Sequence, residues 1–201
     1  MKKQRINILL ITFFMSAVLQ AQTNKPAIDY LSVPGPVVFQ SKSYNLNWSS
    51  HPATGFYKQE YIVKGDNADK YKTMVLIDVL TGETKIKSVV NAKVEEIKKQ
   101  KAVNPMVNYE VISNPKTGEY MIDFLLIANA SDGSTSIVER NVYRYKAGIT
   151  KTGEMVVLLF GISTRAYGAN VDNFFVALKA NRKDLINTVA QYSVPEISIK
   201  K

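Results

Sequence analysis

Four consecutive strand-like runs joined by short turns constrain the fold more than any other feature of this chain. The runs are rich in β-branched and aromatic residues, and they cover residues 107–113, 119–129, 135–145 and 154–165. Their connectors contain turn-forming pairs such as Asn114-Pro115 and Asp132-Gly133. Links this short join antiparallel neighbours, because a parallel pair needs a crossover of a dozen or more residues. The second half of the chain is therefore predicted to contain an antiparallel meander.

The first half of the chain predicts further strands. A short run at residues 37–40 precedes two alternating runs, and the turn cluster SSHPATG between those two predicts a hairpin. The two alternating runs are residues 44–48 and 56–64, and an apolar run follows at residues 72–80. All of these runs have the length of ordinary strands.

Only two segments have helical periodicity. Val90, Val94 and Ile97 recur at i, i+4 and i+7, which predicts an amphipathic helix from Ser88 to about residue 101. A longer apolar stripe predicts a second helix over residues 170–192, ended by a nearby proline. Strands grouped together with only two helices indicate an α+β fold. We therefore expect an antiparallel β-sheet covered by two main helices, one on each face.

This order of elements resembles the PsbP/Mog1-like α/β/α sandwich, in which an N-terminal hairpin and a first helix precede a meander and a C-terminal helix. The resemblance covers residues 37–197 and concerns element order only. The segments YKQEYIVKGD and IVERNVYRYK also resemble small uncharacterised secreted proteins of Gram-negative bacteria. Members of the PsbP/Mog1-like group are mainly accessory or binding proteins, so the resemblance implies a non-catalytic role by analogy.

The N-terminus has the pattern of a cleavable signal peptide over residues 1–22. A basic start is followed by the apolar run INILLITFFMSAV, and Ala21 supplies a small residue at the cleavage site. The apolar run is shorter than the roughly 20 residues that a bilayer-spanning helix needs. The remaining chain is predicted to comprise a lead-in segment, residues 23–36, and a single α+β domain, residues 37–201.

The signal-peptide pattern predicts a periplasmic or secreted location, and the composition narrows the possible partners. Cysteine is absent, which excludes disulfides, thiol nucleophiles and the lipid-anchoring cysteine of a lipoprotein. The processed chain is not expected to span a membrane. The formal net charge is +9, but no run of five or six basic residues occurs, so we expect no nucleic-acid binding.

The sequence contains no recognisable catalytic, metal or cofactor motif. A phosphate-binding loop, a dinucleotide fingerprint and a GxSxG nucleophile turn are all missing from the sequence. The single histidine, His51, lies between Ser50 and Pro52 in a turn, where no third group is fixed to orient its ring. We therefore predict no catalytic residue, no metal ligand and no cofactor.

The informative residues are charged and tyrosine side chains within apolar elements. A charge removed from water is costly unless it is paired, so these residues need partners or solvent. The candidate ligand-binding residues are Asp123, Glu139, Tyr143, Arg144 and Arg165 in the meander and Arg182 in the second helix. Strand alternation places Glu139 and Tyr143 on one face and Arg144 on the other.

Three interpretations of these residues are open. The first is a structural ion-pair network, in which Arg182 or Arg165 meets Asp123 or Glu139. The second is a polar cleft for a small anionic or sugar-like ligand, because arginine binds carboxylate and phosphate in a bidentate manner. The third is a pair of catalytic carboxylates.

These interpretations lead to two hypotheses for the function. The leading hypothesis is an exported, non-catalytic binding or accessory protein of the bacterial cell envelope, whose partner is an envelope protein complex or such a ligand. The alternative is a small envelope hydrolase or lyase that uses carboxylates with tyrosine or arginine.

Overall fold

The computed structural model describes residues 26–200, so the predicted leader and the first residues of the predicted lead-in lie outside the described part. The elements in chain order are β1 (Val37–Phe39), β2 (Lys42–Ala53), β3 (Phe56–Val63), β4 (Thr73–Thr81), α1 (Ile86–Val103), β5 (Asn108–Asn114), β6 (Glu119–Asn129), β7 (Thr135–Ile149), β8 (Met155–Tyr167), the 3-10 turn η1 (Gly168–Asn170) and α2 (Val171–Gln191).

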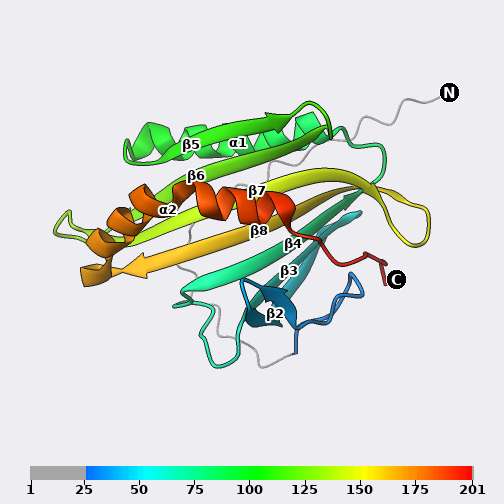
Figure 1. Ribbon diagram of the computed structural model, residues 1–201, viewed down its shortest axis with the longest axis horizontal. Helices are drawn as coiled ribbons and strands as arrows, with labels where there is room; N and C mark the ends of the chain where they lie inside the picture. Colours follow the sequence, from blue (N-terminus) through cyan, green and yellow to red (C-terminus); the bar gives the residue numbers. More distant parts are fainter. Residues whose placement is uncertain (1–25, 201) are drawn as a thin grey trace.

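These strands form one sheet in the order β1-β2-β3-β4-β8-β7-β6-β5, and every neighbouring pair is antiparallel. The first four strands make one meander and the last four make a second one. Because β8 pairs with β4, the two meanders join at the centre of the sheet. Helix α1 connects them, and α2 follows β8 across the sheet (Figure 1).

The two faces of the sheet are named here after the helix that packs on each. Val75, Val142 and Phe160 point to the α2 face, where the second half of α2 packs. Leu76 and Ile122 point to the α1 face, where α1 buries its apolar stripe. This alternation follows from the period of two along a strand. Strands β4 and β8 carry apolar residues on both faces, as central strands do.

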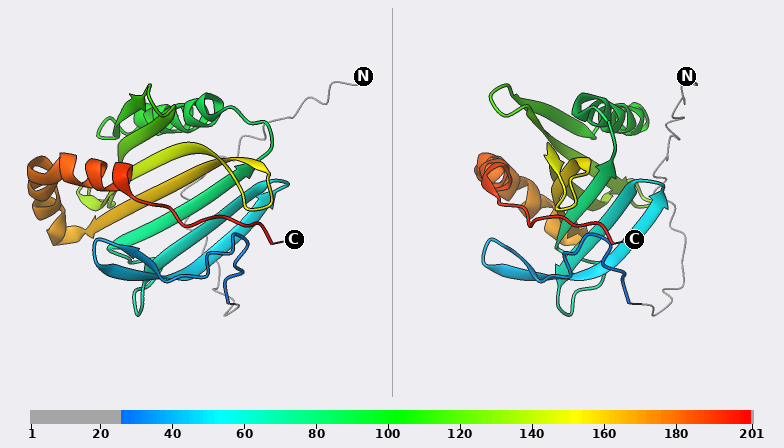
Figure 2. Two further views of the ribbon diagram at one scale, coloured as in Figure 1. Left: turned by 45° about the vertical axis from the view of Figure 1, so that its right-hand side comes forward. Right: turned by 90° about the vertical axis from the view of Figure 1, so that its right-hand side faces the viewer.

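The sheet is strongly curled toward its α2 face. Phe39 of β1 and Phe160 of β8 have ring centroids 6.0 Å apart, although three strands separate β1 from β8. In a flat sheet, four strand spacings would put these two strands about 19 Å apart. Figure 2 shows the β1–β4 half of the sheet turning round to face α2 and the C-terminal tail.

The prediction of a PsbP/Mog1-like α/β/α sandwich with a helix-covered sheet is therefore wrong. Residues 26–200 form a curled, half-barrel-like sheet of eight antiparallel strands with two helices, and the helices lie over only part of the sheet. Helix α1 packs on β5, β6 and β7, and α2 packs on β7 and β8. The physical reason is size: a helix is about 10 Å wide, whereas eight strands span nearly 40 Å at about 4.8 Å each. The uncovered half buries its apolar surface by curling.

Both ends of the described chain fill the concave α2 face. Leu31 and Val33 are buried there, and Leu31 donates its N–H to the side chain of Gln59 at 2.9 Å. Tyr61 donates its hydroxyl to the carbonyl of Val33 at 2.7 Å. The C-terminal tail runs alongside, with the N–H of Ser198 bonded to the carbonyl of Leu31. The predicted lead-in is thus partly a core segment.

Candidate functional site

A groove lies on the α2 face between helix α2 and the edge strand β5. Helix α2 rests mainly on β7 and β8, and residues of β5, β6 and α2 line the space between the helix and β5. One part of the groove has a volume of about 390 Å³ and is lined by Asp123, Leu125, Leu178 and Arg182 among others. A second part of about 670 Å³ continues along α2 and shares Arg182 and Glu110 with the first.

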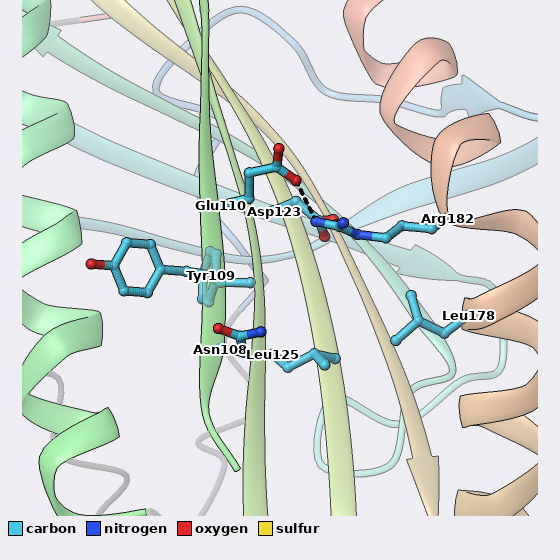
Figure 3. A pocket seen from close by; sticks show the side chains of 8 residues that line it. Asn108, Tyr109, Glu110, Asp123, Leu125, Leu178 and Arg182 are labelled. Carbon is cyan, nitrogen blue, oxygen red and sulfur yellow. Dashed lines mark hydrogen bonds and ion pairs between the residues drawn. The ribbon is translucent and has the colours of Figure 1, made fainter. Parts of the chain in front are cut away.

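Arg182 crosses this groove from α2 to the sheet. Its Nε donates to Oδ2 of Asp123 at 2.7 Å, and its Nη2 donates to Oε2 of Glu110 at 2.7 Å. Figure 3 shows the guanidinium reaching toward both carboxylates, while the ring of Tyr109 points away from the groove. Arg182 is 46% exposed and Glu110 is 52% exposed, so their ion pair faces solvent.

Beneath Arg182 lies a fully buried ion pair. Asp123 accepts two hydrogen bonds from Arg140, from Nε at 2.9 Å and from Nη2 at 3.3 Å. Asp123 and Arg140 are 4% and 5% exposed, respectively. The Nη2 of Arg140 also donates to the carbonyl oxygen of Arg182 at 2.7 Å, next to Asn181, where α2 departs from helical geometry. The buried pair therefore holds both the backbone carbonyl and the guanidinium of Arg182.

The electrostatics of the groove are dominated by these contacts. Burial lowers the pKa of the Arg182 guanidinium, but the hydrogen bond and charge of Asp123, followed by those of Glu110, outweigh it and raise the pKa overall. Arg182 therefore stays cationic at every accessible pH. Lys179 and Lys183 from α2 line the second part of the groove, with Asp184 as the acidic residue beside them.

The sheet divides the six predicted site residues into two groups. Asp123, Arg144 and Arg182 lie on the α2 face, and of these Asp123 and Arg182 meet. Arg144 is bonded instead to Glu119, and its Nη1 donates to the carbonyl of Tyr192 at 2.8 Å, just beyond the C-terminus of α2. Cationic groups at that end of a helix satisfy free carbonyls. Arg144 thus fastens α2 to the sheet.

The other three predicted residues lie on the α1 face. Arg165 is bonded to Glu139, and the hydroxyl of Tyr71 donates to Oε2 of Glu139 at 2.7 Å. The guanidinium of Arg165 stacks over the ring of Tyr71 at 4.3 Å. Tyr143 lies farther along the same face, and burial raises the pKa of its phenol well above the ordinary value. A layer of backbone therefore separates these residues from Asp123 and Arg182.

Several polar residues of importance were not among the predicted set. Arg140 and Glu110 complete the groove network, and Glu119 anchors Arg144. On the α1 face Asp78 is buried, and its Oδ1 has no hydrogen-bond partner among the described residues. Asp78 could have been predicted from the sequence, because a carboxylate within the apolar run TMVLIDVLT is unusual. Glu110 could not have been predicted in this way, because it lies in a polar and exposed strand.

Burial raises the pKa of two carboxyl groups on the α1 face. Desolvation raises the pKa of Glu60 to about 7; the charge of Lys58 opposes this shift and that of Asp78 adds to it. Desolvation likewise raises the pKa of Asp78 against the pull of Lys58, whose ammonium lies 3.7 Å from Oδ2. These acids lie on β3 and β4, on the opposite side of the sheet from the groove.

Within residues 26–200, no three histidine or acidic side chains converge in a way that could hold a metal ion. No helix in that range combines the length and the apolar character needed to cross a bilayer.

The fold and the site define a protein with a curled antiparallel sheet and an arginine-containing groove beside one helix. A family model matches residues 31–194, so the chain belongs to that family, which is uncharacterised. The match agrees with the resemblance to small uncharacterised proteins and offers nothing in favour of the PsbP/Mog1-like group. No curated protein and no solved structure is significantly similar to the chain.

Proposed function

We propose that this protein is an exported, non-catalytic binding protein of the bacterial cell envelope that holds a small anionic or acidic-sugar ligand in the groove between α2 and β5. The observation that carries the proposal is the set of hydrogen-bond partners of the Arg182 guanidinium. Its Nε is fixed by the buried Asp123, whereas its Nη2 has the exposed Glu110 as its one partner within residues 26–200. Among the described residues nothing is bonded to its Nη1.

This arrangement favours exchange of Glu110 for a ligand. An ion pair between exposed groups contributes little, typically about 0.2–1 kcal/mol. A ligand carboxylate or phosphate can therefore replace Glu110 and engage the outer edge of the guanidinium in a bidentate manner. Asp123 holds the guanidinium in place beforehand, which lowers the entropic cost of binding. Lys179 and Lys183 add positive charge along the path of a longer ligand.

The hydrolase or lyase hypothesis has less support from this groove. The two carboxylates nearest to Arg182 are Asp123 and Glu110, and both are already bonded to it. Asp123 also accepts two bonds from Arg140. A general acid or base must reach the reacting atom of a substrate, and Asp123 is buried beneath its partners.

The experiment is a titration with inorganic phosphate and with galacturonate, followed by NMR amide shifts or calorimetry. Arg182→Gln should weaken binding of both probes at least about tenfold, because a charge-assisted bidentate contact is lost. Lys98→Gln is the matched control: it also removes one exposed positive charge, but from α1 on the other face. Equal weakening by both variants, or none by Arg182→Gln, would show that the groove is not the site.

A further inference from the structure

The two edges of the sheet differ in how well they are protected against pairing with another strand. At one edge, β1 has only three residues and is followed at once by Gln40 and Ser41, both with positive φ. At the other edge, β5 has seven residues in unbroken register with β6. Edge strands are normally blunted by lysine, proline or a bulge. Strand β5, with the sequence NYEVISN, has none of these features.

Three exposed apolar residues lie on β5 or shortly before it in the chain. Val111 lies at the centre of β5 and is 41% exposed. Met106, in the link from α1 to β5, and Val103, the last residue of α1, are also exposed. An open strand edge with exposed apolar residues on it and just before it is suited to pairing with a further strand.

We propose that the partner is a second copy of this chain, with β5 paired antiparallel to β5 across a two-fold axis. Such an axis runs perpendicular to the sheet. The α1 helices of both copies therefore lie on one face of the joined sheet, and the α2 helices lie on the other. Full overlap of the seven residues places Val111 opposite Val111 of the second copy and Glu110 opposite Ile112 of the second copy. Identical surfaces that complement themselves are the hallmark of two-fold dimers.

Charge selects this register over its neighbours. Glu110 is the only charged residue of β5. A shift by two residues in one direction would set Glu110 directly opposite Glu110, and like charges in that arrangement are destabilising. A shift by two residues in either direction also shortens the overlap between the two strands. In the full-overlap register each Glu110 keeps its own Arg182 and meets an apolar neighbour, so no unpaired charge is buried.

The dimer does not depend on the proposed ligand. The contact uses the backbone edge of β5 and the exposed side chain of Val111, which lies on the α1 face, whereas Arg182 lies on the α2 face. A seven-residue strand pair is short, about 23 Å long. We therefore expect a weak dimer that dissociates on dilution.

The first test is sedimentation velocity of the purified protein from micromolar to near-millimolar concentration. The wild type should shift from monomer to dimer. Val111→Lys should stay monomeric with an unchanged circular dichroism spectrum, because lysine on an edge strand opposes pairing. Val38→Lys is the matched control, since Val38 is an exposed valine on the other edge strand, β1, and it should dimerise like the wild type. A wild type that stays monomeric throughout overturns the proposal.

The second test maps the register by crosslinking. The chain contains no cysteine, so Val111→Cys introduces a single thiol. Directly opposed residues of an antiparallel pair have Cα atoms about 4.5–5.5 Å apart, which suits a disulfide. Mild oxidation should give a covalent dimer for Val111→Cys and not for Val38→Cys. If the protein dimerises but the two variants crosslink equally, the interface lies elsewhere and the proposed pairing is wrong.

Discussion

Strand β7 carries an ionic network on each of its faces, and the two networks differ in how completely they are satisfied. On the α2 face, Arg140 meets Asp123, and both carboxylate oxygens of Asp123 accept hydrogen bonds from arginine. On the α1 face, Arg165 meets Glu139, and farther along that face Asp78 lies beside Lys58 and keeps an oxygen without a partner among the described residues. The α2-face network therefore holds α2 on the sheet with both carboxylate oxygens bonded, whereas the α1 face also contains carboxyl groups that respond to pH.

Removing the carboxylate of Asp123 from the α2-face network should have the largest effect on stability. Asp123→Ala leaves Arg140 buried without a counter-ion, so we expect a loss of about 2–4 kcal/mol in the free energy of unfolding. Urea denaturation measures this loss. Glu110→Ala is the matched control, because it removes the other carboxylate of Arg182 at an exposed position and should cost less than about 0.5 kcal/mol. Equal costs for both variants would contradict a closed network beneath the groove.

The α1-face carboxyls should make stability depend on pH near neutrality. The pKa of Glu60 is about 7 in the folded protein, against an ordinary value of 4.5. Between these two pH values the folded state binds more protons than the unfolded state, so the free energy of unfolding falls as pH rises. The raised pKa of Asp78 acts in the same direction.

We expect the wild type to lose roughly 1–3 kcal/mol of stability between pH 5 and pH 8. Glu60→Gln, which stays neutral, should reduce this dependence, and the part that remains should come from Asp78, whose pKa is also raised by burial. Chemical denaturation at a series of pH values is the measurement. A wild type whose stability rises over this range, or a variant with the same slope, would show that Glu60 does not carry the effect.

The contrast between the networks also shows what a sequence can reveal. The predicted run at residues 119–129 coincides with β6, and the predicted helix at 170–192 agrees with α2 to within a residue at each end. In these segments the apolar pattern follows one period over many residues. Strand β2 instead continues to Ala53 through SSHPA, which reads as a turn, because β3 supplies a paired strand there.

The curl and the composition of the site depend on contacts between distant segments. Nothing local in the sequence shows that Phe39 meets Phe160, or that Arg182 on α2 meets Asp123 on β6 and Glu110 on β5. Alternation does indicate that a charged residue in a buried strand needs a partner, and Asp123 has one. The identity of that partner follows only from strand order and from the position of α2, which are properties of the whole fold.

The smallest expected effect concerns the exposed ion pair between Glu110 and Arg182 in the α2-face network. Glu110→Ala should leave stability almost unchanged and yet increase the affinity for phosphate about threefold, because the ligand no longer competes with an exposed ion pair of about 0.2–1 kcal/mol. Calorimetric titration with phosphate, compared with Glu95→Ala on α1 as a matched loss of one exposed carboxylate, measures the effect. If Glu95→Ala raises the affinity equally, the gain comes from net charge alone. If Glu110→Ala lowers the affinity, Glu110 assists binding and the exchange at Arg182 is refuted.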